Sequence, residues 1–423
     1  GRTGTVDWDT TPKTATFTAV SGEGYFANTS GGTAFNMNLP AGVAGAIVSV
    51  ADYAATFQTT NLTVVPNGTD KIGSLNLNAI LNVQGQSVTF VFVDSTQGWI
   101  NTMDSTSNVR GLNPFICASV SGACNTLVTA PDCANTKIAT FTGPGDFTVN
   151  SVATCAANNE VSYMVVAGGG GGGWDRAGGG GAGGFREDKS PITPYTASPL
   201  EGAGPITVTA QAYPIDIGGG GAGGNNSSCS AKPGQDGSIS TFSTKTSAGG
   251  GGGGAASPST AGRNGGSGGG TSGPSSSAGS GNTPPVSPSQ GFPGGIAPAA
   301  GGGDHGAGGG GATAAGVPGA GTSPVGTGGA GTTTSISASP TAYAGGGGGG
   351  FSDGAPGCAP FAGGAGGTGG GGAGGSYPGG LGTAGADNTG GGGGGGSNGP
   401  NSSPAGNGGN GGSGIVIIRY KFQ

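Results

Sequence analysis

Few side chains in this sequence could perform acid–base or phosphate chemistry. Histidine occurs once, as His305, with only Asp304 beside it as a charged neighbour. Matches to G-x-G-x-x-G are frequent in so glycine-rich a sequence and carry no information, and no Gly-Lys-Ser/Thr phosphate loop occurs. We therefore expect His305 in an exposed loop, no catalytic residues and no cofactor.

The acidic residues are few and dispersed. The charged cluster at 186–189 is expected at a solvated turn, where ion pairs contribute little. Cleavage of a polysaccharide would need two carboxylates facing each other across a groove, so we keep this activity only as a minor alternative.

The cysteines allow disulfides but not a zinc site. No C-x-x-C pair occurs, so we expect no metal. An even number of cysteines favours disulfides in an extracellular protein, while free buried thiols are the alternative. Cys133 and Cys155 flank a short β-like stretch, and Cys229 and Cys358 fall in separate glycine-rich loops. All six are candidates: Cys117, Cys124, Cys133, Cys155, Cys229 and Cys358.

The composition excludes an ordinary enzyme over most of the length. Of 423 residues, 107 are Gly and 27 are Pro, and only 8% are charged. The net charge of −6 argues against a nucleic-acid partner, which would need a basic surface. No stretch approaches the roughly 20 apolar residues of a membrane span, so we expect no membrane insertion.

Residues 1–104 have the pattern of a small all-β module. Runs with alternating, β-branched residues occur at 14–20, 46–51, 62–65 and 87–93, separated by turn residues. Trp99 follows the longest run and is expected in the core or at its rim. No amphipathic helical pattern occurs, so the fold class is a β-sandwich-like module with essentially no α-helix.

Residues 131–423 form a second, glycine-rich domain after an expected linker at 105–130. A β-like lead-in at 137–167 precedes a region, 168–413, with glycine runs at 168–173, 249–254, 345–350 and 390–396. The string Gly-Gly-Gly-Gly-Ala-Gly-Gly recurs at 178–184, 218–224 and 369–375. A flexible linker has no reason to repeat blocks of equal length, so we expect rods of equal length.

Polyglycine-II helices, which are extended like polyproline II, would satisfy this pattern. Such a helix makes no internal hydrogen bonds, so its N–H and C=O groups can bond to neighbouring rods in a lattice. Apolar strands bracket the region at 161–167 and 414–422, and we expect both in one sheet.

Aromatic residues in the glycine-rich region lie mostly at the ends of the glycine blocks. We expect Phe185 and Tyr213 to cap the rods. We expect four others to lie at loop tips and contact a receptor, because Trp and Tyr give a large contact area at low entropic cost: Trp174, Phe292, Phe351 and Tyr377.

Several stretches of the sequence resemble those of a known group of proteins. The stretches 163–173, 178–186, 343–350 and 411–420 resemble the glycine-rich domain of tail-fibre and tail-tip adhesin proteins of bacteriophages. The stretches 7–13, 24–26 and 92–100 are similar to a β module of marine phage tail-fibre proteins. The resemblance implies stacked layers of polyglycine-II helices whose connecting loops contact the host receptor. It also implies an extracellular place in the virion tail.

The function expected from this resemblance is binding, without chemistry, to a host outer-membrane protein or surface glycan. Contacts with other virion tail proteins are expected too, and a homotrimer is compatible with such a role. The alternative is a structural filament or sheath protein that assembles with copies of itself. Ice binding by a flat glycine-rich slab is a weaker third reading, because the loops are long and irregular.

Overall fold

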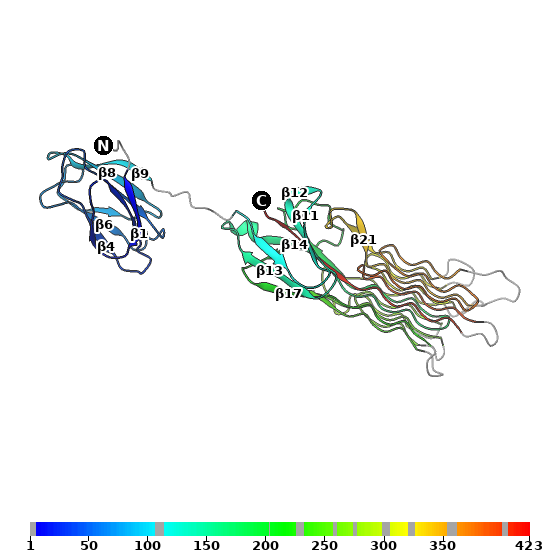
Figure 1. Cartoon of the computed structure of the whole chain (residues 1–423). Coiled ribbons are helices and arrows are strands. Elements are labelled where there is room, and N and C mark those ends of the chain that lie inside the picture. Colours follow the sequence, from blue (N-terminus) through cyan, green and yellow to red (C-terminus); the bar gives the residue numbers. More distant parts are fainter. Residues whose placement is uncertain are drawn as a thin grey trace. The chain divides into compact units, whose positions relative to one another are not determined.

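A computed structural model gives the fold as two compact units, Gly1–Leu112 and Asn113–Gln423 (Figure 1). The structure describes residues 6–105, 114–202, 204–225, 232–256, 260–273, 277–297, 305–319, 326–352, 362–399 and 405–423. The expected all-β fold class is confirmed, since the one helical element in the described residues is a short 3-10 turn at Ala156–Asn159.

The first unit is a sandwich of two sheets around a side-chain core. One sheet contains β1 (Asp7–Lys13), β3 (Glu23–Ala27), β5 (Ile47–Asp52), β8 (Ser87–Asp94) and β9 (Gly98–Ser105), in that order. The other contains β2 (Phe17–Thr18), β4 (Phe35–Asn38), β6 (Leu62–Val65) and β7 (Ala79–Leu81). Trp99 lies fully buried in the core, as the sequence predicts.

The second unit begins with a base of two further sheets. Five strands form one of them: β10 (Cys117–Val120), β13 (Gly145–Ser151), β17 (Ala212–Asp216), β18 (Ser240–Phe242) and β19 (Lys245–Ser247). The other has the order β11 (Thr126–Ala130), β12 (Cys133–Phe141), β22 (Ile415–Lys421), β14 (Glu160–Val166) and β15 (Phe185–Asp188), with β16 (Ile206–Thr207) paired to β14. A small hairpin joins β20 (Thr332–Thr334) to β21 (Thr341–Tyr343).

The two strands that bracket the glycine region pair directly. β14 and β22 run antiparallel with Val166 opposite Ile415, and both are buried on both faces. The predicted common sheet is therefore confirmed. The expected linker at 105–130 needs correction, because β10 and β11 within it pair with β13 and β12 of the second unit.

The glycine region forms extended segments that hydrogen-bond to one another with a period of three residues. Successive N–H groups of segment 168–173 donate to three different segments, and then to the same three again. The acceptors of Gly168 to Gly173 are, in order, the carbonyls of Ser238, Gly412, Gly181, Gln235, Gly409 and Gly178, at 2.9–3.0 Å. Three residues per turn is the repeat of a polyproline-II-type helix, and these residues have negative φ, as that helix requires.

These bonds arrange the segments as a hexagon around one central segment, 178–183, which bonds to six others. The ring of six comprises 168–173, 249–254, 267–271, 306–311, 345–350 and 390–396. Within the described residues, an outer shell holds eleven further segments: 218–224, 234–238, 262–266, 277–281, 292–297, 314–319, 326–331, 362–368, 371–376, 380–386 and 406–413. The core of this lattice is thus hydrogen-bonded backbone.

The outer segments carry exposed side chains, whereas the inner segments consist mostly of glycine. In 406–413, the glycines at 406, 409 and 412 are buried, while Asn407 and Asn410 are exposed. The same alternation of one buried position in three occurs in 218–224, where Ala222 faces outward. A three-residue turn presents every third residue to the same side, so the outer shell tolerates other residue types at its exposed positions.

No segment of the described residues occupies the corner of the outer shell next to segment 249–254, which we call the vacant corner. The segments on either side of this corner, 234–238 and 262–266, are joined by an ion pair of 3.1 Å between Arg263 Nε and Asp236 Oδ1. The same Asp236 oxygen accepts a hydrogen bond of 2.9 Å from the N–H of Gly252. The carboxylate therefore takes the place that a backbone carbonyl would occupy in a filled corner.

Candidate functional site

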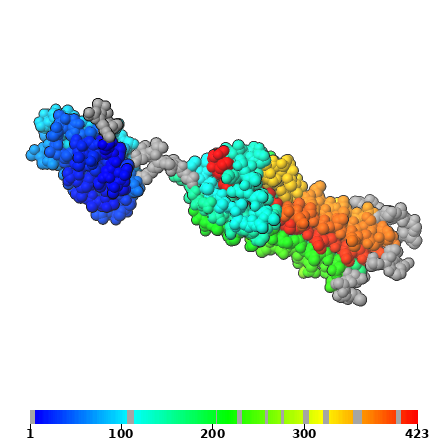
Figure 2. All heavy atoms as spheres, viewed as in Figure 1, coloured from blue at the N-terminus to red at the C-terminus, as the bar shows by residue number. Residues whose placement is uncertain are grey.

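Successive lattice segments run in opposite directions, so their connections gather at two ends. One end joins the sheets of the base, and we call the other the distal end (Figures 1 and 2). Turns at 174–177 and 376–380 lie at the distal end, together with His305, Phe351 and Asn398. Because the lattice segments themselves offer mainly backbone, side chains that could recognise a partner are concentrated here and on the outer shell.

Trp174 lies at the distal turn between the first ring segment and the central segment. Its indole is half-buried, and Nε1 donates a hydrogen bond of 3.2 Å to the carbonyl of Ala405. This bond fixes the ring while leaving part of it accessible. The predicted position of Trp174 at a loop tip agrees with the structure.

The next two residues of this turn have an unusual backbone. Asp175 has φ of 60° and Arg176 has φ of 47°, both in the left-handed region that non-glycine residues rarely adopt. The Arg176 Nε lies 3.4 Å from Asp175 Oδ1. Strained residues of this kind concentrate at binding and catalytic sites, and no sequence motif marks them here.

Two predictions at the distal end are wrong. His305 was expected in an exposed loop but is only 2% exposed, and Phe351, expected to contact a receptor, is only 6% exposed. Their rings stack with centroids 4.3 Å apart, and His305 Nδ1 accepts a hydrogen bond of 3.1 Å from the N–H of Ser352. Both residues flank ring segments, which neighbours surround on every side, so the adjoining side chains are covered too.

The other two receptor candidates lie at opposite ends of the lattice. Tyr377 is half-buried in a distal turn, next to Ser376, whose carbonyl accepts a hydrogen bond of 2.9 Å from Ser397 Oγ. Phe292 is half-buried at the base end, where its N–H donates to Gly311. The structure thus brings Trp174 and Tyr377 to one end and excludes Phe292 from it.

The aromatic residues expected to cap the rods divide similarly. Phe185 is buried in the cluster that joins the base to the lattice, against Ala182 of the central segment, as a cap would be. Tyr213 instead lies in the core between the two sheets of the base, so its predicted capping role is wrong.

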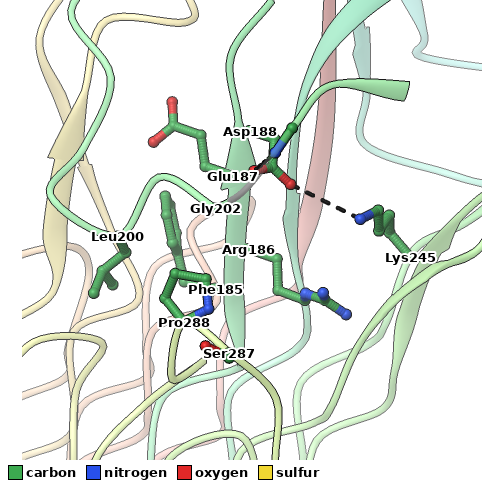
Figure 3. A pocket seen from close by; sticks show the side chains of 10 residues that line it. Phe185, Arg186, Glu187, Asp188, Leu200, Gly202, Lys245, Ser287 and Pro288 are labelled. Atoms are coloured by element: carbon green, nitrogen blue, oxygen red, sulfur yellow. Dashed lines mark hydrogen bonds and ion pairs between the residues drawn. The ribbon is translucent and has the colours of Figure 1, made fainter. Parts of the chain in front are cut away.

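The charged cluster at 186–189 is not the solvated turn that the sequence indicated. Its first three residues belong to β15, where Glu187 and Asp188 are 2% and 4% exposed. A cavity of about 270 Å³ lies beside this strand, lined by Arg186, Leu200, Lys245 and Pro288 among others (Figure 3).

The two carboxylates point in opposite directions, as Figure 3 shows. Asp188 accepts hydrogen bonds from the Tyr163 hydroxyl and, at 3.1 Å, from the N–H of Gly204, and lies 3.9 Å from Lys245 Nζ. Glu187 accepts from the hydroxyl of Thr334 and, at 2.9 Å, from the N–H of Ser198, while burial raises the pKa of its carboxyl. Two carboxylates on opposite faces of a strand cannot flank one glycosidic bond.

The described cysteines are free thiols. Cys117, Cys124 and Cys155 are exposed and Cys133 is half-buried, and none of these four candidates is in a disulfide. Cys229 and Cys358 lie outside the described residues. Across the described ranges, no group of three or more His, Cys, Asp or Glu side chains could hold a metal ion. The part of the chain that the structure describes also contains no helix long and apolar enough to cross a membrane.

The architecture is that of a class of proteins in which a β-sheet base carries a lattice of extended glycine helices. The lattice is held together by hydrogen bonds between backbone groups. The glycine-rich domain family matches residues 142–421, which include the bracketing strands and the whole lattice between them. The chain therefore belongs to this family. No curated protein matches the chain.

Proposed function

We propose that this protein is an adhesin of the phage tail-fibre type, which binds a receptor on the host cell surface through the distal end of its lattice. Binding requires no chemistry. The partner is an outer-membrane protein or a surface glycan, and the setting is an extracellular virion tail.

The observation that carries this proposal is the distal turn at 174–177. Trp174 presents a ring that a hydrogen bond holds in place, and the strained residues Asp175 and Arg176 follow it. A rigid aromatic residue loses little entropy on binding, and Trp, Tyr and Arg are the residue types that most often dominate binding energy. The resemblance to phage adhesins supports the same role for this end.

Binding of the labelled full-length chain to intact cells tests the proposal, using a panel of marine bacterial strains. For a strain that the parent protein binds, we expect Trp174→Ala to weaken binding about tenfold or more. The reason is that buried contacts of this type contribute more than about 1.4 kcal/mol to binding. Phe292→Ala is the matched control, since Phe292 is also half-buried but lies at the base end. It should leave binding unchanged, and both variants should keep the parent melting temperature.

The proposal fails if Trp174→Ala binds cells as well as the parent does. The alternative of a self-assembling filament or sheath would instead give fibres in light scattering without cell binding. Two features oppose lattice growth by added copies. Asp236 closes the vacant corner, and on the outer shell Asn410 Oδ1 already accepts a hydrogen bond of 2.9 Å from the N–H of Gly223.

A further inference from the structure

We infer that the first unit carries a second, independent binding site, for a neutral oligosaccharide, on the outer face of its five-stranded sheet. This site does not depend on the proposed role of the distal end. It is a trough of about 590 Å³ that runs over β5 and β8, between β1 on one side and β9 on the other.

The strand register places small residues on the floor of this trough. Trp8, Gly24, Ser49, Thr89 and Met103 are successive partners across β1, β3, β5, β8 and β9, so their side chains share one face. The opposite face holds the core. Gly24, Ser49 and Thr89 in the middle of the row are small, so open space remains above them. Trp8 and Met103 form the two walls of this space.

One wall is an exposed aromatic surface. The Trp8 ring is 44% exposed and lies over Gly24, where any Cβ would overlap it. The aromatic surface continues beyond the residues that line the trough. The Phe26 ring centroid lies 4.9 Å from that of Trp8, and Tyr53, which is 51% exposed, has its ring centroid 6.5 Å from that of Phe26. A pyranose ring has an apolar C–H face that packs on such rings, and a row of them suits a chain of sugars.

The floor of the trough and the residues beside Met103 are polar, as sugar hydroxyls require. Ser49 Oγ and Thr89 Oγ1 are 2.8 Å apart on the floor, and each hydroxyl keeps further hydrogen-bonding capacity. Ser87 and Thr102 also line the trough. Hydroxyl groups beside an aromatic wall match a sugar better than an apolar peptide, which would leave them unpaired.

The charge of the trough favours a neutral ligand. Asp104 is the only charged residue among the described residues that line it. Its register partner is Val88 of the core, so its side chain lies on the opposite face of the sheet, where Gln86 Nε2 at 3.3 Å and Asn101 Nδ2 at 3.4 Å donate to the carboxylate. A uronic-acid or phosphorylated sugar would lose hydration of its charges without meeting a cation in the trough.

Calorimetric titration of the full-length chain with cellohexaose and laminarihexaose, alongside a hexagalacturonate, tests the inference. We expect at least one neutral hexasaccharide to bind, with the anionic one at least about tenfold weaker. Trp8→Ala should weaken binding about tenfold, as stacking energies of this size imply. Ile80→Ala is the control, because Ile80 is exposed on β7 of the other sheet.

A second measurement separates lost binding from lost folding. Sugar should change the tryptophan fluorescence of the parent, and the change should disappear in Trp8→Phe, which keeps an aromatic ring and binds within a few-fold of the parent. The inference is overturned if no neutral hexasaccharide binds at millimolar concentration, if folded Trp8→Ala binds like the parent, or if the hexagalacturonate binds best. Cell binding lost in Trp8→Ala but not in Trp174→Ala would overturn the proposed distal site and leave this one standing.

Discussion

Gly180, in the central segment, shows why most inner positions of the lattice are glycine. A Cβ there would overlap the carbonyl oxygen of Gly170, and the segment bonds to neighbours on every side. Gly219 provides a natural comparison, because it has the same extended conformation on the outer shell but has nothing within 4 Å of its would-be Cβ.

We expect Gly180→Ala to lower the free energy of unfolding by about 3 kcal/mol or more, since displaced neighbours leave several backbone groups unpaired at about 1–3 kcal/mol each. Gly219→Ala should stay within about 1 kcal/mol of the parent, and a small gain is expected because alanine restricts the unfolded chain. Melting temperatures of the two variants measure the difference. Equal values would contradict an ordered lattice.

The residue scale is also where prediction from sequence was weakest. Whether His305 or Phe351 is exposed depends on which segments surround it, and those come from remote parts of the chain. Phe292 could not be assigned to the base end or the distal end of the lattice from sequence, because that depends on how many lattice segments precede it. The trough in the first unit depends on strand register, which alternation alone does not determine.

At the scale of elements, more of the fold could be predicted from the sequence than at the scale of single residues. The uninterrupted runs of six or seven glycines all lie in inner segments, such as 168–173 and 345–350, where neighbouring segments cover every side. Outer segments such as 406–413 carry a different residue at every third position. The bracketing strands were predictable because apolar residues without alternation indicate burial on both faces.

The vacant corner makes an element-level prediction. Asp236→Ala removes the acceptor of the Gly252 N–H and should destabilise the second unit by about 1–2 kcal/mol. Arg263→Ala removes only the exposed ion pair, which is worth less than about 1 kcal/mol. Urea unfolding of both variants gives the comparison. A larger loss for Arg263→Ala would show that the ion pair, and not the carbonyl-like acceptor, closes the corner.

At the scale of the whole molecule, the two units differ in what holds them together. The first buries Trp99, Phe90 and similar side chains, whereas the lattice buries mainly peptide groups. On unfolding, exposure of apolar surface raises the heat capacity of the protein solution, whereas exposure of polar surface lowers it.

We therefore expect two calorimetric transitions with unlike heat-capacity changes. The first unit should give an ordinary value of about 12–15 cal/mol/K per residue, and the second unit a clearly lower one. Gly180→Ala should shift only the transition of the second unit, and this shift identifies which of the two transitions belongs to that unit. Equal values per residue would mean that hidden apolar burial, and not backbone bonding, stabilises the lattice.

The pairing of β14 with β22 restricts how many times the chain can cross the lattice. A chain that leaves and re-enters the same sheet must travel outward as often as it returns, so its crossings are even in number. A two-shell hexagon has a centre and rings of six and twelve, which is an odd total. A single chain anchored at one end can therefore never fill it, so one site is left without a segment, and here the Asp236 carboxylate closes that site.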